Sequence, residues 1–99
     1  MKFIITESKL ESLIFKYLDN QDFVKIEKRI YVYFFNSVDD DFSQISYNKL
    51  TSYCHITPDL IKEISSFFSL EDFDSERLIG EWVENTLQMK VLKTYRQMY

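Results

Sequence analysis

Small and conformationally special residues are scarce in this chain. Its 99 residues include one glycine, one proline, one cysteine and no alanine. A single glycine excludes the glycine-rich phosphate-binding loops of P-loop and dinucleotide-binding proteins, which need several glycines at fixed spacing. A single cysteine excludes a disulfide framework and a zinc site built from several cysteines. We therefore expect no cofactor.

Long apolar runs are also missing. No window approaches the roughly 20 apolar residues that cross a bilayer. The apolar run at Phe3–Ile5 is too short for the core of a signal peptide. The lone Cys54 fits a reducing compartment. We expect a cytoplasmic protein without a membrane partner.

Apolar and aromatic residues are nevertheless abundant, at 45% and 17% of the chain. A chain of this length buries about two-thirds of its unfolded surface, which suffices for one core. The sequence therefore predicts a single globular domain over residues 1–99.

The net charge of −4 is unevenly distributed along the sequence. Val38–Glu84 holds eleven acids and three bases, which gives −8, whereas the first 37 residues sum to +1 and the last 15 to +3. Such asymmetry marks either an interaction surface or a solvated face that keeps a small protein in solution.

Periodicity in the first half predicts a short strand over Phe3–Ile5 and then an amphipathic helix capped by Thr6 or Ser8. Alternation of period two over Phe23–Phe35 predicts either one long bent strand or two short strands that turn near Lys28. The apolar positions of the first helix are Leu10, Leu13, Ile14, Tyr17 and Leu18.

Weaker patterns predict strands over Phe42–Tyr47 and Leu50–Ile56. Thr57 followed by Pro58 is a strong helix start, because threonine caps the first turn and proline suits the first helical position. A third helix is expected to begin at Asp74 or Ser75, and a closing strand to cover Met89–Tyr95. The expected fold class is α+β, with about three amphipathic helices packed on a small antiparallel or mixed β-sheet.

Catalysis and metal binding find little support in the sequence. Cys54 and His55 are adjacent, so on a strand they point to opposite faces and cannot form a nucleophile–base pair. Asp39, Asp40 and Asp41 lack the spaced ligands, bend glycine and distal glutamate of a calcium loop. We predict a buried thiol, a solvated acidic turn, no metal site and no enzymatic activity.

Aromatic residues next to bases raise the question of nucleic acid, because single strands bind through stacking and basic side chains. The net negative charge argues against this partner, and the periodic positions of the aromatic residues favour core packing. The residues concerned are Tyr31, Tyr33, Phe35, Tyr47, Lys90, Lys93, Tyr95, Arg96 and Tyr99.

The candidate contacts for a protein partner are acidic and aromatic. Glu81 and Glu84 lie at i, i+3 on the polar face of the third helix, and the run Asp39, Asp40, Asp41 adds further charge. Of the adjacent pair Phe67 and Phe68, one ring must face partly outward, and we take Phe68 as the exposed anchor.

The opening segment Lys2–Ile14, in which Ile-Ile-Thr-Glu leads into an amphipathic helix, resembles the start of many small uncharacterised proteins of large tailed bacteriophages. The segment Leu78–Glu84 is similar in style to closing helices of such proteins. The resemblance implies a phage accessory protein made in the host cytoplasm, or a virion protein, and carries no activity with it.

The resulting hypothesis is a small acidic, non-enzymatic protein-interaction module that binds a host or phage protein. One alternative is a virion structural or assembly component, which could form a homo-oligomer. The other is a DNA mimic or a nucleic-acid-binding protein.

Overall fold

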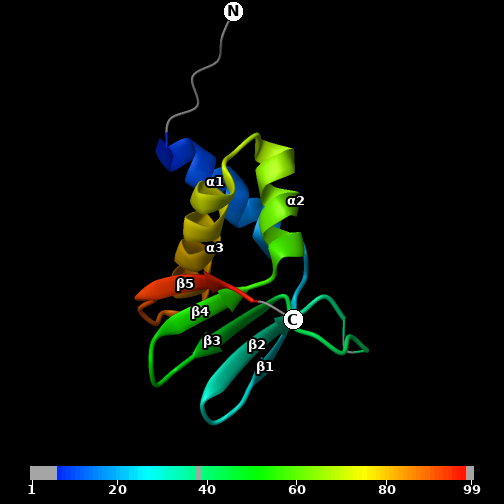
Figure 1. Ribbon diagram of the computed structural model, residues 1–99, viewed down its shortest axis with the longest axis vertical. Helices are drawn as coiled ribbons and strands as arrows, with labels where there is room; N and C mark the ends of the chain where they lie inside the picture. Colours follow the sequence, from blue (N-terminus) through cyan, green and yellow to red (C-terminus); the bar gives the residue numbers. More distant parts are fainter. Residues whose placement is uncertain (1–6, 38, 98–99) are drawn as a thin grey trace, which may run out of the picture.

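The computed structural model describes residues 7–37 and 39–97 of the chain, and the predicted strand Phe3–Ile5 lies outside them. Figure 1 shows an α+β arrangement in which three helices gather on one side of a five-stranded sheet. The elements in chain order are α1 (Glu7–Asp19), β1 (Val24–Glu27), β2 (Tyr31–Phe35), β3 (Ile45–Asn48), β4 (Tyr53–Ile56), α2 (Pro58–Phe68), α3 (Asp72–Leu87) and β5 (Lys93–Arg96).

The sheet is mixed, with the strands in the order β1-β2-β3-β4-β5. The first three pairings are antiparallel, and β4 pairs with β5 in parallel. Of the two alternatives for Phe23–Phe35, the pair of short strands is confirmed: the chain turns at Lys28, whose N–H donates to the carbonyl of Tyr31 at 2.7 Å.

The other strands are shorter than the sequence predicts, because side chains satisfy the backbone before pairing begins. The Asn48 side-chain oxygen accepts from the N–H groups of Leu50 and Thr51, which builds a turn, so β4 begins only at Tyr53. The Glu84 carboxylate accepts from the N–H of Val91 at 2.9 Å and holds the segment before β5 as a loop.

Helix α2 begins as predicted, with the Thr57 hydroxyl accepting from the N–H of Leu60 at 3.3 Å. The prediction that the third helix is capped by Asp74 or Ser75 is wrong, because α3 begins at Asp72 and Glu71 is its N-cap residue. Ser75 is instead fully buried, 2.7 Å from the hydroxyl of Ser65, and joins α3 to α2.

Helix α3 is the central element of the core. It contacts β4 and β5, whereas α1 and α2 pack mainly against α3, which refines the expectation of three helices packed on the sheet. The ring of Trp82 lies 5.3 Å from that of Phe34 on β2 and 5.8 Å from that of Phe23. Its indole N–H donates to the carboxylate of Asp19 at 2.9 Å, so one side chain links α1, α3 and the sheet.

The only glycine of the chain, Gly80, lies in the middle of α3 and is buried. A Cβ atom at this position would overlap the Cγ2 methyl of Thr94 on β5. The helix backbone therefore rests directly on the strand, and glycine is required here for close approach rather than for a turn.

Replacing Gly80 by alanine tests this contact. Helix propensity alone would favour alanine by about 1 kcal/mol, but we expect Gly80→Ala to lower the free energy of unfolding by about 1–3 kcal/mol, because the added methyl is overpacked against Thr94. Urea unfolding followed by Trp82 fluorescence measures the change. Thr94→Ser removes the opposing methyl, so the double variant should regain most of the loss. A Gly80→Ala protein as stable as the parent would contradict the contact.

Candidate functional site

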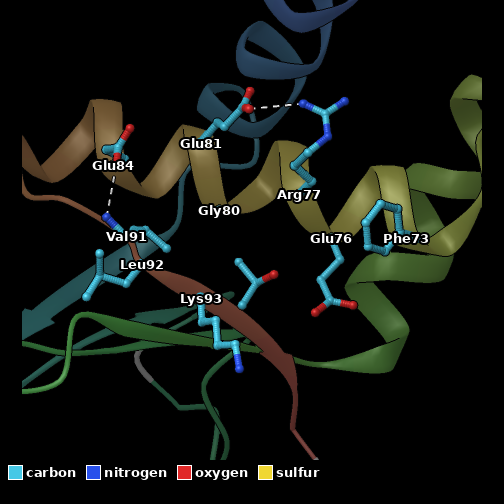
Figure 2. Close-up of a pocket in the computed structure, with 10 residues that line it drawn as sticks. Phe73, Glu76, Arg77, Gly80, Glu81, Glu84, Val91, Leu92 and Lys93 are labelled. Carbon is cyan, nitrogen blue, oxygen red and sulfur yellow. Dashed lines mark hydrogen bonds and ion pairs between the residues drawn. The ribbon is translucent and has the colours of Figure 1, made fainter.

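An open cleft of about 490 Å³ lies between α3 and β5. Figure 2 shows Phe73 at one end of the cleft, Val91 and Leu92 at the other, and Gly80 between them. At Gly80 the helix backbone lies directly on Thr94 of β5. The side chains of α3 on either side of this glycine form one wall of the cleft.

Two of the predicted partner contacts, Glu81 and Glu84, meet in this cleft. Glu81 accepts from the guanidinium of Arg77 at 3.0 Å, and both side chains remain more than a third exposed. Glu84 bonds to the N–H of Val91 and so has a structural role as well as a charge. Glu76, which is not among the predicted partner contacts, adds a third carboxylate 3.6 Å from the guanidinium of Arg96.

The strand that borders the cleft is an edge strand. Within residues 7–37 and 39–97, β5 pairs with β4 alone. The N–H of Gln97 donates to the carbonyl of Ile56 at 2.7 Å, in register with the pairing of Ile56 and Arg96, so the backbone groups of Lys93 and Tyr95 point toward β4. The alternation of an extended strand turns the N–H and C=O groups of Thr94 and Arg96 away from β4. These backbone groups are available to another extended segment.

Large apolar side chains flank this edge. Phe73 in the first turn of α3 is 75% exposed, and Leu92 just before β5 is 58% exposed. The cleft thus combines two apolar side chains, an acidic helical wall and unpaired backbone groups of a strand.

The acidic run Asp39, Asp40 and Asp41 belongs to a different place. It lies in the loop between β2 and β3, and its last two residues border a separate hollow together with Phe42 and Asp59. The Asp40 carboxylate accepts from the N–H of Ser37 at 3.0 Å, which makes this segment a turn, as predicted. The structure therefore does not join this run to Glu81 and Glu84 in one surface.

The part of the chain that the structure describes holds no group of three or more histidine, cysteine, aspartate or glutamate side chains that could hold a metal ion.

The aromatic pair on α2 points differently from the expectation. Phe67 is 66% exposed, whereas Phe68 is half buried and its ring packs edge-on against that of Tyr17 at 5.6 Å. The outward ring is thus Phe67 rather than Phe68: both rings contact Tyr17 of α1, but only Phe68 also packs against the buried core.

The predicted core packing of the aromatic residues is confirmed for Tyr47 but is wrong for Tyr31, Tyr33 and Phe35. Tyr47 is 2% exposed, and its hydroxyl donates to the carbonyl of Lys90 at 2.8 Å. The other three alternate with the buried Val32 and Phe34 and lie on the opposite face of the sheet. The period-two pattern predicts a strand buried on both faces. It fits equally well a strand with one buried face and one face of exposed or half-buried aromatic rings, which is what β2 has.

Cys54 and His55 point to opposite faces of β4, as predicted. The thiol is fully buried in the core, whereas His55 lies half buried beside Tyr95. Burial, and then the nearby carboxylate of Glu76, raises the pKa of the Cys54 thiol from 9.0 to about 12. The thiol is therefore protonated at neutral pH and is a poor nucleophile.

This raised pKa predicts a dependence of stability on pH. Between pH 9 and 12 the unfolded chain loses the Cys54 proton while the native protein keeps it, so the free energy of unfolding falls as pH rises, by about 1.4 kcal/mol per unit from this group. Cys54→Ala should lack this contribution. Urea unfolding of both proteins at pH 8, 9, 10 and 11 gives the difference in slope, in which the other titrating groups cancel. Equal slopes would contradict the assignment.

The comparisons with known proteins leave the site to be interpreted from its own geometry. Within the described residues, no helix is both long enough and apolar enough to span a bilayer. No protein-family model, no curated protein and no solved structure matches this chain.

Proposed function

We propose that this protein is a non-enzymatic interaction module that binds an extended, basic segment of a partner protein in the cleft between α3 and β5. The observation that carries the proposal is the free edge of β5 beside an acidic helical wall.

The backbone of β5 supports strand addition. An extended peptide laid along the outer side of β5 would exchange hydrogen bonds with the N–H and C=O groups of Thr94 and Arg96. Main-chain hydrogen bonds of this kind supply affinity that does not depend on the sequence of the peptide. Alternate side chains of the peptide supply specificity. Those that point toward α3 would enter the cleft and reach Phe73 and Leu92.

Charge supports a basic occupant. Helix α3 carries five acids and one arginine. The segments that build the helical side, residues 7–19 and 58–87, carry eleven acids and four bases together, which gives −7. Lysine or arginine side chains of an approaching segment are attracted to this wall, which raises the association rate and sets the choice of partner.

A binding role is favoured over catalysis because the one thiol is buried and its pKa is raised, and because His55 faces the other side of β4. The role of a phage accessory protein that acts on a host or phage protein, in the host cytoplasm or as part of a virion, stays a prediction. Self-association along the same edge is the competing outcome, because a second copy could also add a strand to β5.

Titration with two synthetic peptides tests the proposal. We expect a twelve-residue peptide of alternating lysine and valine to bind, and its counterpart of glutamate and valine not to bind, as measured by isothermal titration calorimetry at low salt. Glu81→Lys should weaken binding about five- to tenfold, which corresponds to roughly 1 kcal/mol. Glu63→Lys on α2 makes the same charge change outside the cleft and should have little effect.

A second pair of variants separates strand addition from charge alone. Arg96→Pro removes an outward N–H at the last residue of β5, where proline is tolerated because this N–H does not pair with β4, whereas Arg96→Ala keeps it. Weaker binding in the proline variant than in the alanine variant supports pairing at the edge. Equal affinities, or equal weakening by Glu81→Lys and Glu63→Lys, would overturn the proposal.

A further inference from the structure

The sheet face that points away from the helices carries aromatic side chains on three of its strands. Residues paired directly across a sheet share a face, so the register places these side chains together, opposite the buried Val32 and Phe34. Phe34 contacts Trp82 of α3, so the aromatic side chains that alternate with it on β2 point away from the helices. We call this surface the aromatic face, and its members are Tyr31, Tyr33, Phe35, Tyr53, His55 and Tyr95.

The rings form two rows. On β2, the rings of Tyr31 and Tyr33 lie 5.6 Å apart and nearly parallel, at 17°. On β4 and β5, the rings of His55 and Tyr95 lie 5.5 Å apart at 25°. Between the rows, β3 presents only small polar side chains, Ser46 and Asn48. Because neighbouring strands lie about 4.8 Å apart, the rows are separated by roughly 10 Å across β3.

The surface is accessible and has polar edges. Tyr31 and Tyr95 are each 36% exposed, and Tyr33, Tyr53 and His55 are half buried. Four of the six rings are tyrosines, whose hydroxyls can bond a polar ligand, as Tyr31 does in accepting from the amide of Asn48 at 3.3 Å. Such a surface suits flat, polar-edged ring systems better than an aliphatic partner.

Bases gather at one end of the aromatic face. Lys28 and Arg29 form the β1–β2 turn, Lys49 lies in the β3–β4 turn, and Lys93 is the register partner of Tyr53. The pairing of Tyr31 with Asn48 brings both turns to that end. The loop with the three adjacent aspartates joins the opposite ends of β2 and β3.

The charge balance of the sheet side differs from that of the whole chain. Residues 20–57 and 88–97 hold seven bases and five acids, which gives +2 against −7 on the helical side. The net charge of −4 argues against nucleic acid when taken along the sequence, but the excess of acids behind it lies in the helical segments. Lys93 also lies close to this face, with its ammonium 5.6 Å from the Tyr95 ring.

We propose that the aromatic face binds single-stranded nucleic acid, with unpaired bases stacked on the two rows and the phosphates directed to Lys28, Arg29 and Lys93. Stacking on aromatic side chains accepts any base, and a basic border follows the backbone. Charge complementarity favours this occupant over a second copy of the chain, because two copies joined face to face would bring their positive sides together.

Fluorescence anisotropy with labelled twelve-nucleotide single strands, oligo-dT and oligo-U, tests the proposal at low salt. We expect binding of at least one of them, and the two probes distinguish a DNA from an RNA preference. A duplex of the same length should bind much more weakly, because its bases are already stacked. Affinity should fall as salt rises, since phosphate contacts release counterions.

Variants separate stacking from packing and charge. Tyr33→Leu and Tyr95→Leu keep an apolar side chain but lose the ring, so each should weaken binding about fivefold or more. Lys93→Glu should weaken it further and reduce its salt dependence. Phe73→Leu makes the same chemical change on the helical side and should leave binding unchanged.

Three results would overturn the proposal. The first is no anisotropy change with either strand at several hundred micromolar protein. The second is binding that the two tyrosine variants leave intact while circular dichroism shows them folded. The third is light scattering that reveals a dimer which Tyr33→Leu dissolves. Because Glu81 lines only the cleft and Tyr33 lies only on the aromatic face, loss of peptide binding in Glu81→Lys and loss of nucleic-acid binding in Tyr33→Leu are separate outcomes.

Discussion

The close approach of α3 to β5 at Gly80 is the constraint on which the rest of the architecture depends. It places the backbone of the central helix directly against an edge strand, and α1 and α2 then pack on that helix. Helix α3 consequently joins the helices to the sheet through its contacts with β4 and β5. The same contact leaves room for the cleft on either side of the glycine, where longer side chains separate helix and strand.

Strand β5 takes part in both proposed binding surfaces because successive side chains of a strand alternate between faces. Thr94 points to α3 beneath the cleft, and Tyr95 lies on the aromatic face beside His55. The outward backbone groups of Thr94 and Arg96 form the edge itself. A partner strand that orders β5 would therefore also fix the position of one stacking ring, which gives the two surfaces a physical connection.

Local signals in the sequence predict much of the fold. The Thr57–Pro58 start of α2, the turn near Lys28 and the opposite orientation of Cys54 and His55 each depend on neighbouring residues alone, and each is confirmed. The predicted start of α3 is wrong because Ser75, a good capping residue, bonds to Ser65 on α2 instead of capping α3. Long-range contacts of this kind leave no mark in local periodicity.

The site was harder to predict for two reasons. A strand that is apolar on both faces has the same pattern whether it is covered twice or exposes tyrosines, so Tyr31 and Tyr33 could be placed only once their strand partners were known. Charge summed along the sequence also misleads. The segment Val38–Glu84, with its net charge of −8, contains both the aspartate loop of the sheet and the acidic residues of α3. The fold places these two groups apart. The cleft residues Glu81 and Glu84 were found because helical spacing predicts a shared surface.

The separation of +2 on the sheet side from −7 on the helical side makes the molecule an electric dipole. In the field of a polyanion such a molecule is repelled as a whole but experiences a torque that turns its sheet toward the source. Orientation would thus be selected before contact, at distances up to about the Debye length of 8–10 Å. At high ionic strength this alignment disappears, and encounters with any charged surface become random in orientation.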